Sequence, residues 1–299
     1  MTGVIFLDKP KGLTSFVAAN RVKRILNAKK SGHTGTLDPM ATGVLPVMLG
    51  GATRFLNYIA DSDKGYRATF SLGITTDTLD ITGNNLSQCS VDASPQDVEN
   101  GLEKFRGNIM QTPPMFSAKS VDGVRLYDLA RQGVEVERKP CPVEIKRLEL
   151  IEASADDNRY VIDVLCSKGT YIRSLIDDIG KALGCGAVMT ALERTMAMGF
   201  TLDDCVTIEQ LQARKDDGVG FDDIVIDAEE ILSNYQAIAV SQAQSTRFSN
   251  GGALDINRIK AKICKDTLYR VYSHDGVFLG LGMATDQEIR VEKLLTKRD

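Results

Sequence analysis

The feature that most constrains the fold is a strict alternation of apolar and polar side chains at residues 66–72. One face receives Tyr66, Ala68, Phe70 and Leu72, and the other receives Arg67, Thr69 and Ser71. A period of two is typical of a β-strand that buries one face. Residues 160–167 alternate in the same way. We therefore expect a sheet with one face covered by other elements.

Three other segments space their apolar residues three and four positions apart, as helices do. They begin after Thr14 or Ser15, at Ser94-Pro95 and after Thr170, and we expect the hydroxyl residues to cap them. The three apolar stripes are Ala18, Val22 and Ile25, then Val98, Leu102 and Phe105, then Ile172, Leu175, Ile176 and Ile179. Strands and helices together predict an α+β fold.

The character of the chain changes after about residue 235, where short β-like runs replace the mixture of strands and helices. Asp275-Gly276 lies between two such runs and is typical of a β-hairpin. We expect a larger domain at 1–235 and a small β domain at 238–299. Residues 111–145 contain adjacent prolines, a glycine turn and several basic residues, and are expected to leave the core as a long excursion.

Composition places the chain among ordinary soluble proteins. Hydrophobic residues make up 43% and charged residues 25% of its 299 residues. Its apolar runs are shorter than the roughly 18 residues that a membrane span needs. The opening residues lack the basic start and long apolar stretch of a signal peptide. We expect a cytoplasmic protein with no membrane segment.

Metal and cofactor motifs are not found. The six cysteines form no C-x-x-C pair, and neither His33 nor His274 has a second ligand nearby at metal-binding spacing. Phosphate-loop and nucleophile-elbow motifs are also missing from the sequence. We therefore expect any catalysis to use side chains alone, with no metal and no cofactor.

Charge is distributed unevenly along a chain whose net charge is −4. The first fifty residues contain seven Lys or Arg against two Asp or Glu, and residues 201–250 contain three against ten. A local basic face can bind phosphates on an acidic protein, because salt screens the more distant charges. A cluster of this kind is more often a solvated helix face, and both interpretations stay open at this point.

Residues 32–46, GHTGTLDPMATGVLP, are rich in Gly, Thr and Pro, yet Leu37 and Met40 can anchor the segment on apolar surface. A loop held in this way can fix one polar side chain. Apart from His33, Asp38 is its only ionisable residue. Taken alone, an aspartate before proline is more often part of a turn, and a lone histidine is more often structural.

This segment resembles the signature of the bacterial tRNA pseudouridine-55 synthases, the TruB type. Other stretches resemble the family in the same order along the chain. They are LDKPKGLTS at 7–15, LGGATRF at 49–55, DKGYRATFSLG at 63–73, TDTLDITG at 76–83, QTPPMFSAKSVDGVRLYDLARQG at 111–133 and CSKGTYIRSLIDDIGKALGCGA at 166–187. Beyond about residue 200 the likeness fades.

The resemblance implies a fold and an activity. The fold is the pseudouridine synthase catalytic fold, a mixed and largely antiparallel central sheet with surrounding helices, followed by a small PUA-like β-barrel that binds RNA. The activity is isomerisation of uridine to pseudouridine at position 55, in the T-loop of tRNA, with the target base flipped out. The base leaves ribose C1′ at N1 and rejoins through C5, which needs neither a redox agent nor a cofactor.

The resemblance also implies the catalytic residues. In the family a catalytic aspartate pairs with an arginine, and the matching residues are Asp38 and Arg173. The carboxylate could attack C1′, add to the uracil ring or remove a ribose proton, and each role requires it to be ionised. Arg173 falls in the first turn of its expected helix, where positive charge opposes the helix dipole and a carboxylate would compensate it. The alternative is an exposed arginine.

Three further residues match the family's base pocket. Tyr66 would by default pack in the core, but it matches the tyrosine that lies against the target base. Tyr171 matches an aromatic residue that contacts the base or supports the site. Leu192 matches an apolar residue that closes the pocket.

Contacts with tRNA are implied as well. His33 matches the histidine that fills the space of the flipped base. Lys9, the basic helix at 21–30 and the excursion at 111–145 are expected to contact phosphates, and the excursion resembles the family's flexible thumb. At position 54 this chain has Arg where many members have Lys, so a planar guanidinium group replaces a single ammonium group.

Two alternatives use the same residues. One is a tRNA-binding or tRNA-folding protein without catalysis, for which Asp38 would be dispensable. The other is the guide-RNA-dependent relative of archaea and eukaryotes, which usually carries added segments that dock partner proteins. The compact chain favours the stand-alone type, which we expect to act on the T-arm of tRNA as a monomer with no obligatory protein partner.

Overall fold

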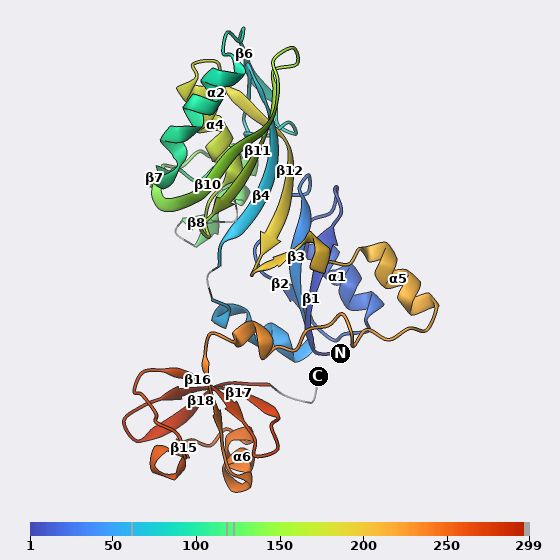
Figure 1. The fold of residues 1–299 in the computed structure, drawn as a ribbon, viewed down its shortest axis with the longest axis vertical. Helices are drawn as coiled ribbons and strands as arrows, with labels where there is room; N and C mark the ends of the chain where they lie inside the picture. The colour runs from blue at the N-terminus through green and yellow to red at the C-terminus, as the bar shows by residue number, and fades with distance from the viewer. Residues whose placement is uncertain (61, 118, 122, 296–299) are drawn as a thin grey trace.

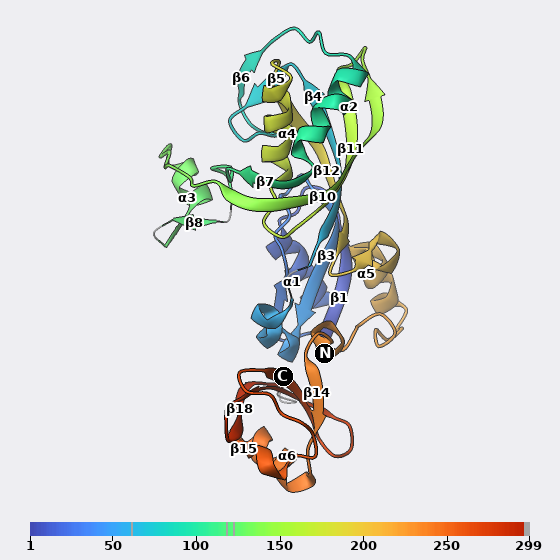
Figure 2. The same ribbon diagram turned by 60° about the vertical axis from the view of Figure 1, so that its left-hand side comes forward.

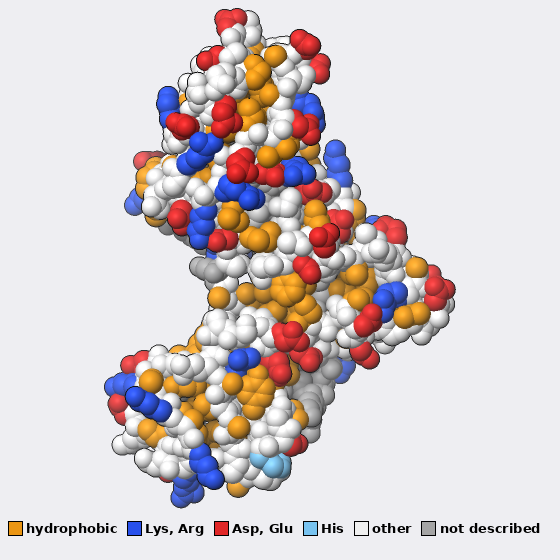
Figure 3. All heavy atoms as spheres, viewed as in Figure 1, with side chains coloured by type: hydrophobic (Ala, Val, Ile, Leu, Met, Phe, Trp, Pro, Cys, Tyr) orange, Lys and Arg blue, Asp and Glu red, His pale blue; other side chains and the backbone are white. Residues whose placement is uncertain are grey.

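The computed structural model describes residues 1–60, 62–117, 119–121 and 123–295. They form an elongated molecule with a long twisted sheet above a smaller sheet (Figure 1). On the face drawn in Figure 3, Lys and Arg side chains lie among Asp and Glu side chains over both parts. Within the described ranges, every helix is too short or too polar to cross a membrane.

The larger sheet has nine strands, in the order β1-β3-β12-β4-β11-β10-β7, with β2 paired to β3 and β13 to β12. The strands are β1 (Gly3–Lys9), β2 (Ser31–His33), β3 (Thr42–Leu49), β4 (Lys64–Leu72), β7 (Gly107–Gln111), β10 (Cys141–Ser154), β11 (Arg159–Cys166), β12 (Ala187–Ala197) and β13 (Phe200–Thr201). Neighbours run antiparallel except β3 and β12, which are parallel. The expected mixed, largely antiparallel sheet is confirmed.

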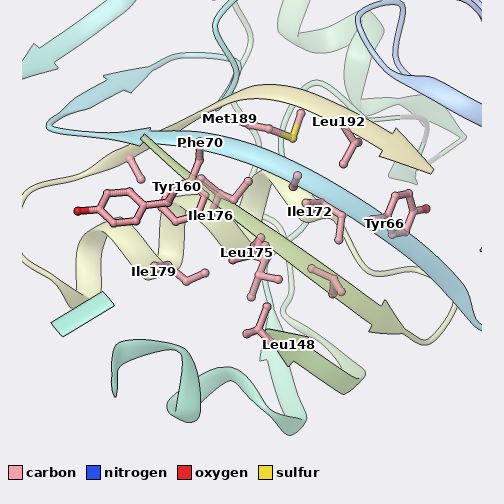
Figure 4. Close-up of a cluster of buried hydrophobic side chains, with 14 of the residues drawn as sticks. Tyr66, Phe70, Leu148, Tyr160, Ile172, Leu175, Ile176, Ile179, Met189 and Leu192 are labelled. Carbon is pink, nitrogen blue, oxygen red and sulfur yellow. The ribbon is translucent and has the colours of Figure 1, made fainter. Parts of the chain in front are cut away.

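One face of this sheet is covered by α2 (Pro95–Leu102) and α4 (Ile172–Ala182). The alternation in β4 is confirmed, because Tyr66, Ala68, Phe70 and Leu72 are buried in the same hydrophobic cluster as the two helices. Figure 4 shows Tyr66 at one end of this cluster, near Leu192 and Ile172, with its hydroxyl pointing away from the cluster. The position of β4 thus brings a polar group to the edge of an apolar core.

Strands β1 and β3 are buried on both faces. Helices α1 (Ser15–Ile25) and α5 (Ile208–Asp216) pack against one face, which includes Ile5 and Leu45. The opposite face, which includes Val4 and Val44, joins a third cluster with the 3₁₀ helix η1 (Gly50–Tyr58) and the C-terminal sheet. Burial on both faces explains why the two strands are nearly continuous apolar runs.

Two of the three expected helix starts are confirmed and the third is wrong. Thr14 caps α1 by accepting a hydrogen bond from the Val17 N–H, and Ser94 begins α2 in a capping box with Asp97. The cap of α4 is Tyr171 rather than Thr170, whose hydroxyl donates to the Ser167 carbonyl at 2.9 Å. The preceding turn therefore uses the hydroxyl that was expected to cap the helix.

Residues 112–140 leave the sheet between β7 and β10, and the part with α3 protrudes sideways (Figure 2). This segment contains β8 (Ser120–Val121), β9 (Val124–Arg125) and α3 (Leu126–Arg131). The expected excursion spanned 111–145, but Gln111 ends β7 and residues 141–145 belong to β10. Its positions 118 and 122 lie outside the described residues.

The smaller sheet has five strands, in the order β14-β16-β17-β18-β15. The elements are β14 (Gln236–Ala239), α6 (Gln242–Ser249), β15 (Leu254–Asp255), β16 (Leu268–Tyr272), β17 (Phe278–Ala284) and β18 (Glu288–Leu294). The hairpin expected at Asp275-Gly276 joins the antiparallel strands β16 and β17. Positions 296–299 of the expected small domain lie outside the described residues.

Candidate active site

Asp38 lies in the loop between β2 and β3, and this loop is held at several points. Leu37 and Ala41 are buried beneath it. The Ser15 hydroxyl, at the start of α1, accepts a hydrogen bond from the Leu37 N–H at 2.8 Å and donates to the Leu37 carbonyl at 3.1 Å. These contacts fix the backbone immediately before Asp38.

Asp38 and Arg173 form an ion pair, with 3.0 Å between Oδ2 of the aspartate and Nε of the arginine. The Arg173 side chain is buried, whereas 36% of the Asp38 side chain is exposed. The two residues are far apart in the sequence. They meet because the loop between β2 and β3 and the start of α4 border the same hollow. A carboxylate that is partly open to solvent and held by a buried guanidinium can both contact a ligand and remain oriented.

A second carboxylate supports Arg173 from the other side. Asp80 lies in the loop between β5 (Ile74–Thr76) and β6 (Asn85–Gln88), and its Oδ2 is 3.7 Å from Nη1 of Arg173. Asp80 is itself buried and accepts hydrogen bonds from the hydroxyls of Thr78 and Thr82. Arg173 therefore lies between two carboxylates, and its orientation is fixed on both sides.

Arg173 also binds two backbone carbonyls. Nη1 donates to Thr78 at 3.0 Å, and Nη2 donates to Phe116 at 2.7 Å. The Phe116 carbonyl belongs to the segment that leaves the sheet after β7. The guanidinium thus links the aspartate loop, the β5–β6 loop and the start of this excursion.

Burial raises the pKa of the Asp38 carboxyl above its ordinary value of 3.8. Arg173 opposes this rise, Asp80 adds to it as a like charge, and Lys9 opposes it. The burial effect is the largest, so the net direction is upward. Arg173 and Lys9 are the neighbours that favour the charged form of Asp38 against burial.

A cavity of about 450 Å³ opens beside this ion pair. Its lining brings together five of the residues singled out in the sequence, namely Asp38, Tyr66, Tyr171, Arg173 and Leu192. The volume falls within the range of roughly 300–1,000 Å³ that is typical of small-molecule sites. The cavity combines apolar side chains with the ion pair, several hydroxyl groups and three lysines, Lys64, Lys119 and Lys168.

Tyr66 contributes the polar end of a buried side chain to this cavity. Burial raises the pKa of its phenol, and the nearby guanidinium of Arg194 acts in the opposite direction. Arg194 lies opposite Tyr66 in the pairing of β12 with β4. Cys166 and the carboxylate of Asp38 add to the rise in the Tyr66 pKa, so Arg194 is the group that opposes it.

Two of the residues expected at the RNA lie beside a neighbouring cavity or on the outer surface. His33 lines a hollow of about 330 Å³ that shares Gly35, Lys64 and Lys168 with the first cavity. Burial lowers the pKa of His33, and Arg194 lowers it further. Arg54 is exposed on η1 and lines neither cavity.

Lys9 is buried rather than exposed. Its ammonium group donates to the carbonyls of Leu13 at 2.7 Å and Pro10 at 3.0 Å. Burial lowers its pKa from 10.5 to about 8, while the charge of Asp38 acts against this change. Lys9 therefore lies where a phosphate would not reach it, contrary to the phosphate contact expected from the sequence.

Three residues around the site were not singled out from the sequence: Asp80, Gln111 and Arg194. Asp80 lies in the stretch TDTLDITG, whose acidic residues carried no assigned role. Arg194 shares the inward face of β12 with Leu192, so a charged residue at an inward position was the available signal. Among the described residues, His, Cys, Asp and Glu form no group of three or more that could hold a metal ion.

Comparison with protein-family models gives three matches along the chain. The TruB family pseudouridylate synthase N-terminal domain matches residues 23–172. The tRNA pseudouridylate synthase B C-terminal domain matches residues 173–233, and the pseudouridine synthase II TruB C-terminal model matches residues 237–295. Each match contains one or more of the segments described above.

Relatives are similar over nearly the whole chain. A protein of Pseudomonas fluorescens (strain Pf0-1), named tRNA pseudouridine synthase B, is 44% identical and covers 99% of this chain and 96% of its own. One of Clostridium perfringens (strain 13 / Type A), with the same name, is 43% identical and covers 99% of both chains. A solved structure of a Cbf5-Nop10-Gar1 complex matches with a TM-score of 0.73 and 28% identity, over 100% of this chain and 86% of that chain.

Proposed function

Because the chain belongs to the TruB family of pseudouridylate synthases, we propose that it acts on uridine 55 in the T-loop of tRNA and that Asp38 is its catalytic carboxylate. The enzyme class follows from the family: the chain is a tRNA pseudouridine synthase, which isomerises uridine to pseudouridine in tRNA. The position in the tRNA and the role of the aspartate are the proposal.

The observation that carries the proposal is the ion pair of Asp38 and Arg173 at the wall of a cavity that Tyr66, Tyr171 and Leu192 also line. The reaction requires an ionised carboxylate held next to the ribose and its base. Asp38 is held in this way at the wall of the cavity. Arg173 supplies the positive charge that favours the ionised form. Asp80 orients Arg173 in turn.

The isomerisation breaks the bond between C1′ and N1, rotates the base and joins C1′ to C5. The proton on C5 is released and N1 gains a proton, so the product has the same atoms and oxidation level as the substrate. Asp38 takes part by attacking C1′, by adding to the uracil ring or by removing a ribose proton. Tyr66 lies against the base and takes part in proton transfer at C5, and Tyr171 and Leu192 hold the detached uracil in the cavity.

A uridine inside a folded RNA loop must leave the stack before its C1′ is accessible, at a cost of a few kcal/mol. We assign His33 to the space that the flipped base leaves. Its hollow lies next to the catalytic cavity, because Gly35, Lys64 and Lys168 line both. Arg54 and the exposed basic residues of α1 are assigned to phosphates near the loop.

The remaining parts of the chain are assigned to tRNA binding. Residues 112–140 act as a clamp over the T-arm, since their first residues are tied to the wall of the cavity. The catalytic part ends at about residue 235, and the smaller sheet from about residue 238 adds RNA contacts. We propose that the chain acts as a monomer without an obligatory protein partner.

A role in tRNA folding would use the same RNA-binding surface. It differs from catalysis in one respect, because loss of the Asp38 carboxylate would leave it unchanged. One variant therefore separates the two roles.

The test is the conversion of uridine in a T-arm stem-loop RNA by Asp38→Asn. We expect no detectable pseudouridine and an RNA dissociation constant within about threefold of the unaltered protein. Asp163→Asn is the matched control, since Asp163 also pairs with an arginine, Arg67, at 2.8 Å but lies outside the cavity. Product formation by Asp38→Asn at the control's rate would remove the catalytic assignment, and modification at another uridine of whole tRNA would remove the position.

A further inference from the structure

Arg194 is the largest of the fully buried side chains, and the mechanism above does not use it. It lies in β12, opposite Gly43 of β3 on one side and Tyr66 of β4 on the other. A fully buried arginine is rare unless an anion neutralises it. In the part of the chain that the structure describes, no carboxylate pairs with Arg194.

The guanidinium instead binds backbone carbonyls on both sides of Asp38, one in its loop and one in β3. Nε donates to the Val44 carbonyl at 2.7 Å, and Nη1 donates to the Gly35 carbonyl at 3.1 Å. Gly35 precedes Asp38 in the chain and Val44 follows it. One side chain therefore holds the backbone on the two sides of Asp38 at a fixed separation.

Glycines make this close approach possible. Gly43 has φ +97°, and a Cβ there would lie 2.3 Å from the Arg194 carbonyl oxygen. Gly35 has φ +71°, and a Cβ there would lie 3.2 Å from Nη1 of Arg194. Gly35 thus leaves room for the Arg194 guanidinium, and Gly43 leaves room for the backbone of β12 at the same residue.

The same guanidinium faces Tyr66. Its charge favours the ionised form of the Tyr66 phenol, and the phenol in turn favours the charged form of Arg194. Nη2 of Arg194 nevertheless makes no well-aligned hydrogen bond to any described atom. The Tyr66 oxygen is the acceptor that interacts with this guanidinium, and negative charge on that oxygen would strengthen the interaction, whereas the Asp38 carboxylate opposes that charge.

We propose that Arg194 is a positioning residue, which fixes the Asp38 loop through Gly35 and Val44 and stabilises negative charge on the oxygen of Tyr66. Ionisation of Tyr66 breaks its O–H bond, leaves the electron pair on oxygen and releases the proton to water. The inference rests on the proposed function, because Arg194 acts on Asp38 and Tyr66, which are both residues of the proposed catalytic site. Arg194 does not line the cavity, so it acts through them.

The first test measures Tyr66 directly and needs no catalysis. A 3-fluorotyrosine placed at position 66 reports its ionisation through its ¹⁹F resonance during a pH titration. Arg194→Gln should raise the pKa of this phenol by about one unit or more, a tenfold change in its ionisation constant. Arg67→Gln, which alters an exposed arginine of β4 next to Tyr66, should leave it unchanged. An unchanged titration in Arg194→Gln overturns the proposal.

The second test uses Arg194→Lys, which keeps the buried charge and is the variant more certain to fold. A single ammonium group cannot reach both carbonyls and Tyr66 together. We expect the single-turnover rate at saturating stem-loop RNA to fall about tenfold or more, with RNA affinity within threefold. In a Tyr66→Phe background the same substitution should cost much less.

Equal losses in the two backgrounds would overturn the role at Tyr66, and no loss in either would overturn the role at the Asp38 loop as well. The proposed function fails in a different way, through a lack of conversion by the unaltered protein or retained conversion in Asp38→Asn. The ¹⁹F titration remains decisive for Arg194 in either case.

Discussion

The side chain of Gln111 holds both backbone polar groups of Tyr171: its Oε1 accepts from the N–H at 2.7 Å and its Nε2 donates to the carbonyl at 3.0 Å. Gln111 is buried at the end of β7, where the excursion leaves the sheet. Next to it, the Ser174 hydroxyl donates to the Thr112 carbonyl at 3.0 Å. The start of the excursion and the start of α4 are therefore joined into one unit at the wall of the cavity.

Gln111→Leu should destabilise the protein and slow catalysis. The substitution leaves the N–H of Tyr171 without its partner, whereas the carbonyl keeps the helical hydrogen bond from the Leu175 N–H. An unpaired N–H costs about 1–3 kcal/mol, so we expect the free energy of unfolding to fall by roughly that amount, as measured by urea denaturation. The single-turnover rate should fall more than RNA affinity does. Gln88→Leu, at an exposed glutamine of β6, is the control and should change neither quantity.

Asp80→Asn should move the acidic limb of the pH–rate profile to lower pH. Asp80 raises the pKa of Asp38 as a like charge, so its neutralisation lowers that pKa and keeps Asp38 ionised in more acidic solution. The amide keeps the shape of the side chain, but Arg173 loses one of its two carboxylates. We expect a lower maximal rate together with the shifted limb. A shift to higher pH would contradict the assignment of the limb to Asp38.

Lys9 should make the stability of the protein rise between about pH 8 and pH 10. Burial lowers its pKa from 10.5 to about 8, so in this range the unfolded chain binds more protons than the folded one. The free energy of unfolding then increases with pH, since the charged form no longer has to be buried. Urea denaturation of Lys9→Met at a series of pH values should show a flatter dependence than that of the unaltered protein. Parallel curves would argue against a buried, titrating Lys9.

RNA affinity should fall steeply with salt. Each phosphate contact releases counterions, so a site with about six contacts loses on the order of a thousandfold in affinity between 50 and 200 mM salt. Arg21→Gln, at an exposed residue of α1, should reduce the slope of log affinity against log salt by roughly one. Lys104→Gln, beyond the end of α2, is the control and should leave the slope unchanged. A flat response in the unaltered protein would contradict the assignment of α1 to phosphates.

Local patterns predicted the elements that build the site. The period of two in β4 was enough to place Tyr66 on the buried face, and the spacing of Ala18, Val22 and Ile25 predicted the inner face of α1. The pairing of Asp38 with Arg173 was implied by family resemblance, because no local pattern relates residues so far apart. The structure brings the two within 3.0 Å.

The errors have two physical causes, which are a partner distant in the sequence and burial by the rest of the fold. Thr170 is a good cap by its chemistry, but the turn before α4 uses its hydroxyl and Gln111 binds the N–H of Tyr171 instead. Lys9 looks like a surface lysine in the sequence, yet the carbonyls of Pro10 and Leu13 bind it in the interior. Arg194 could not be interpreted without knowing that Gly35 and Val44 lie beside it.

The third hydrophobic cluster contains side chains from both sheets. Phe278 of β17 packs against Phe55 of η1, with ring centres 5.7 Å apart, and the Tyr58 hydroxyl donates to Glu292 of β18. A chain that ends at residue 235 would therefore expose to solvent an apolar surface that is buried in the intact protein. Such a fragment would tend to aggregate, so loss of RNA binding after truncation would report damage to the catalytic half as well as the missing sheet.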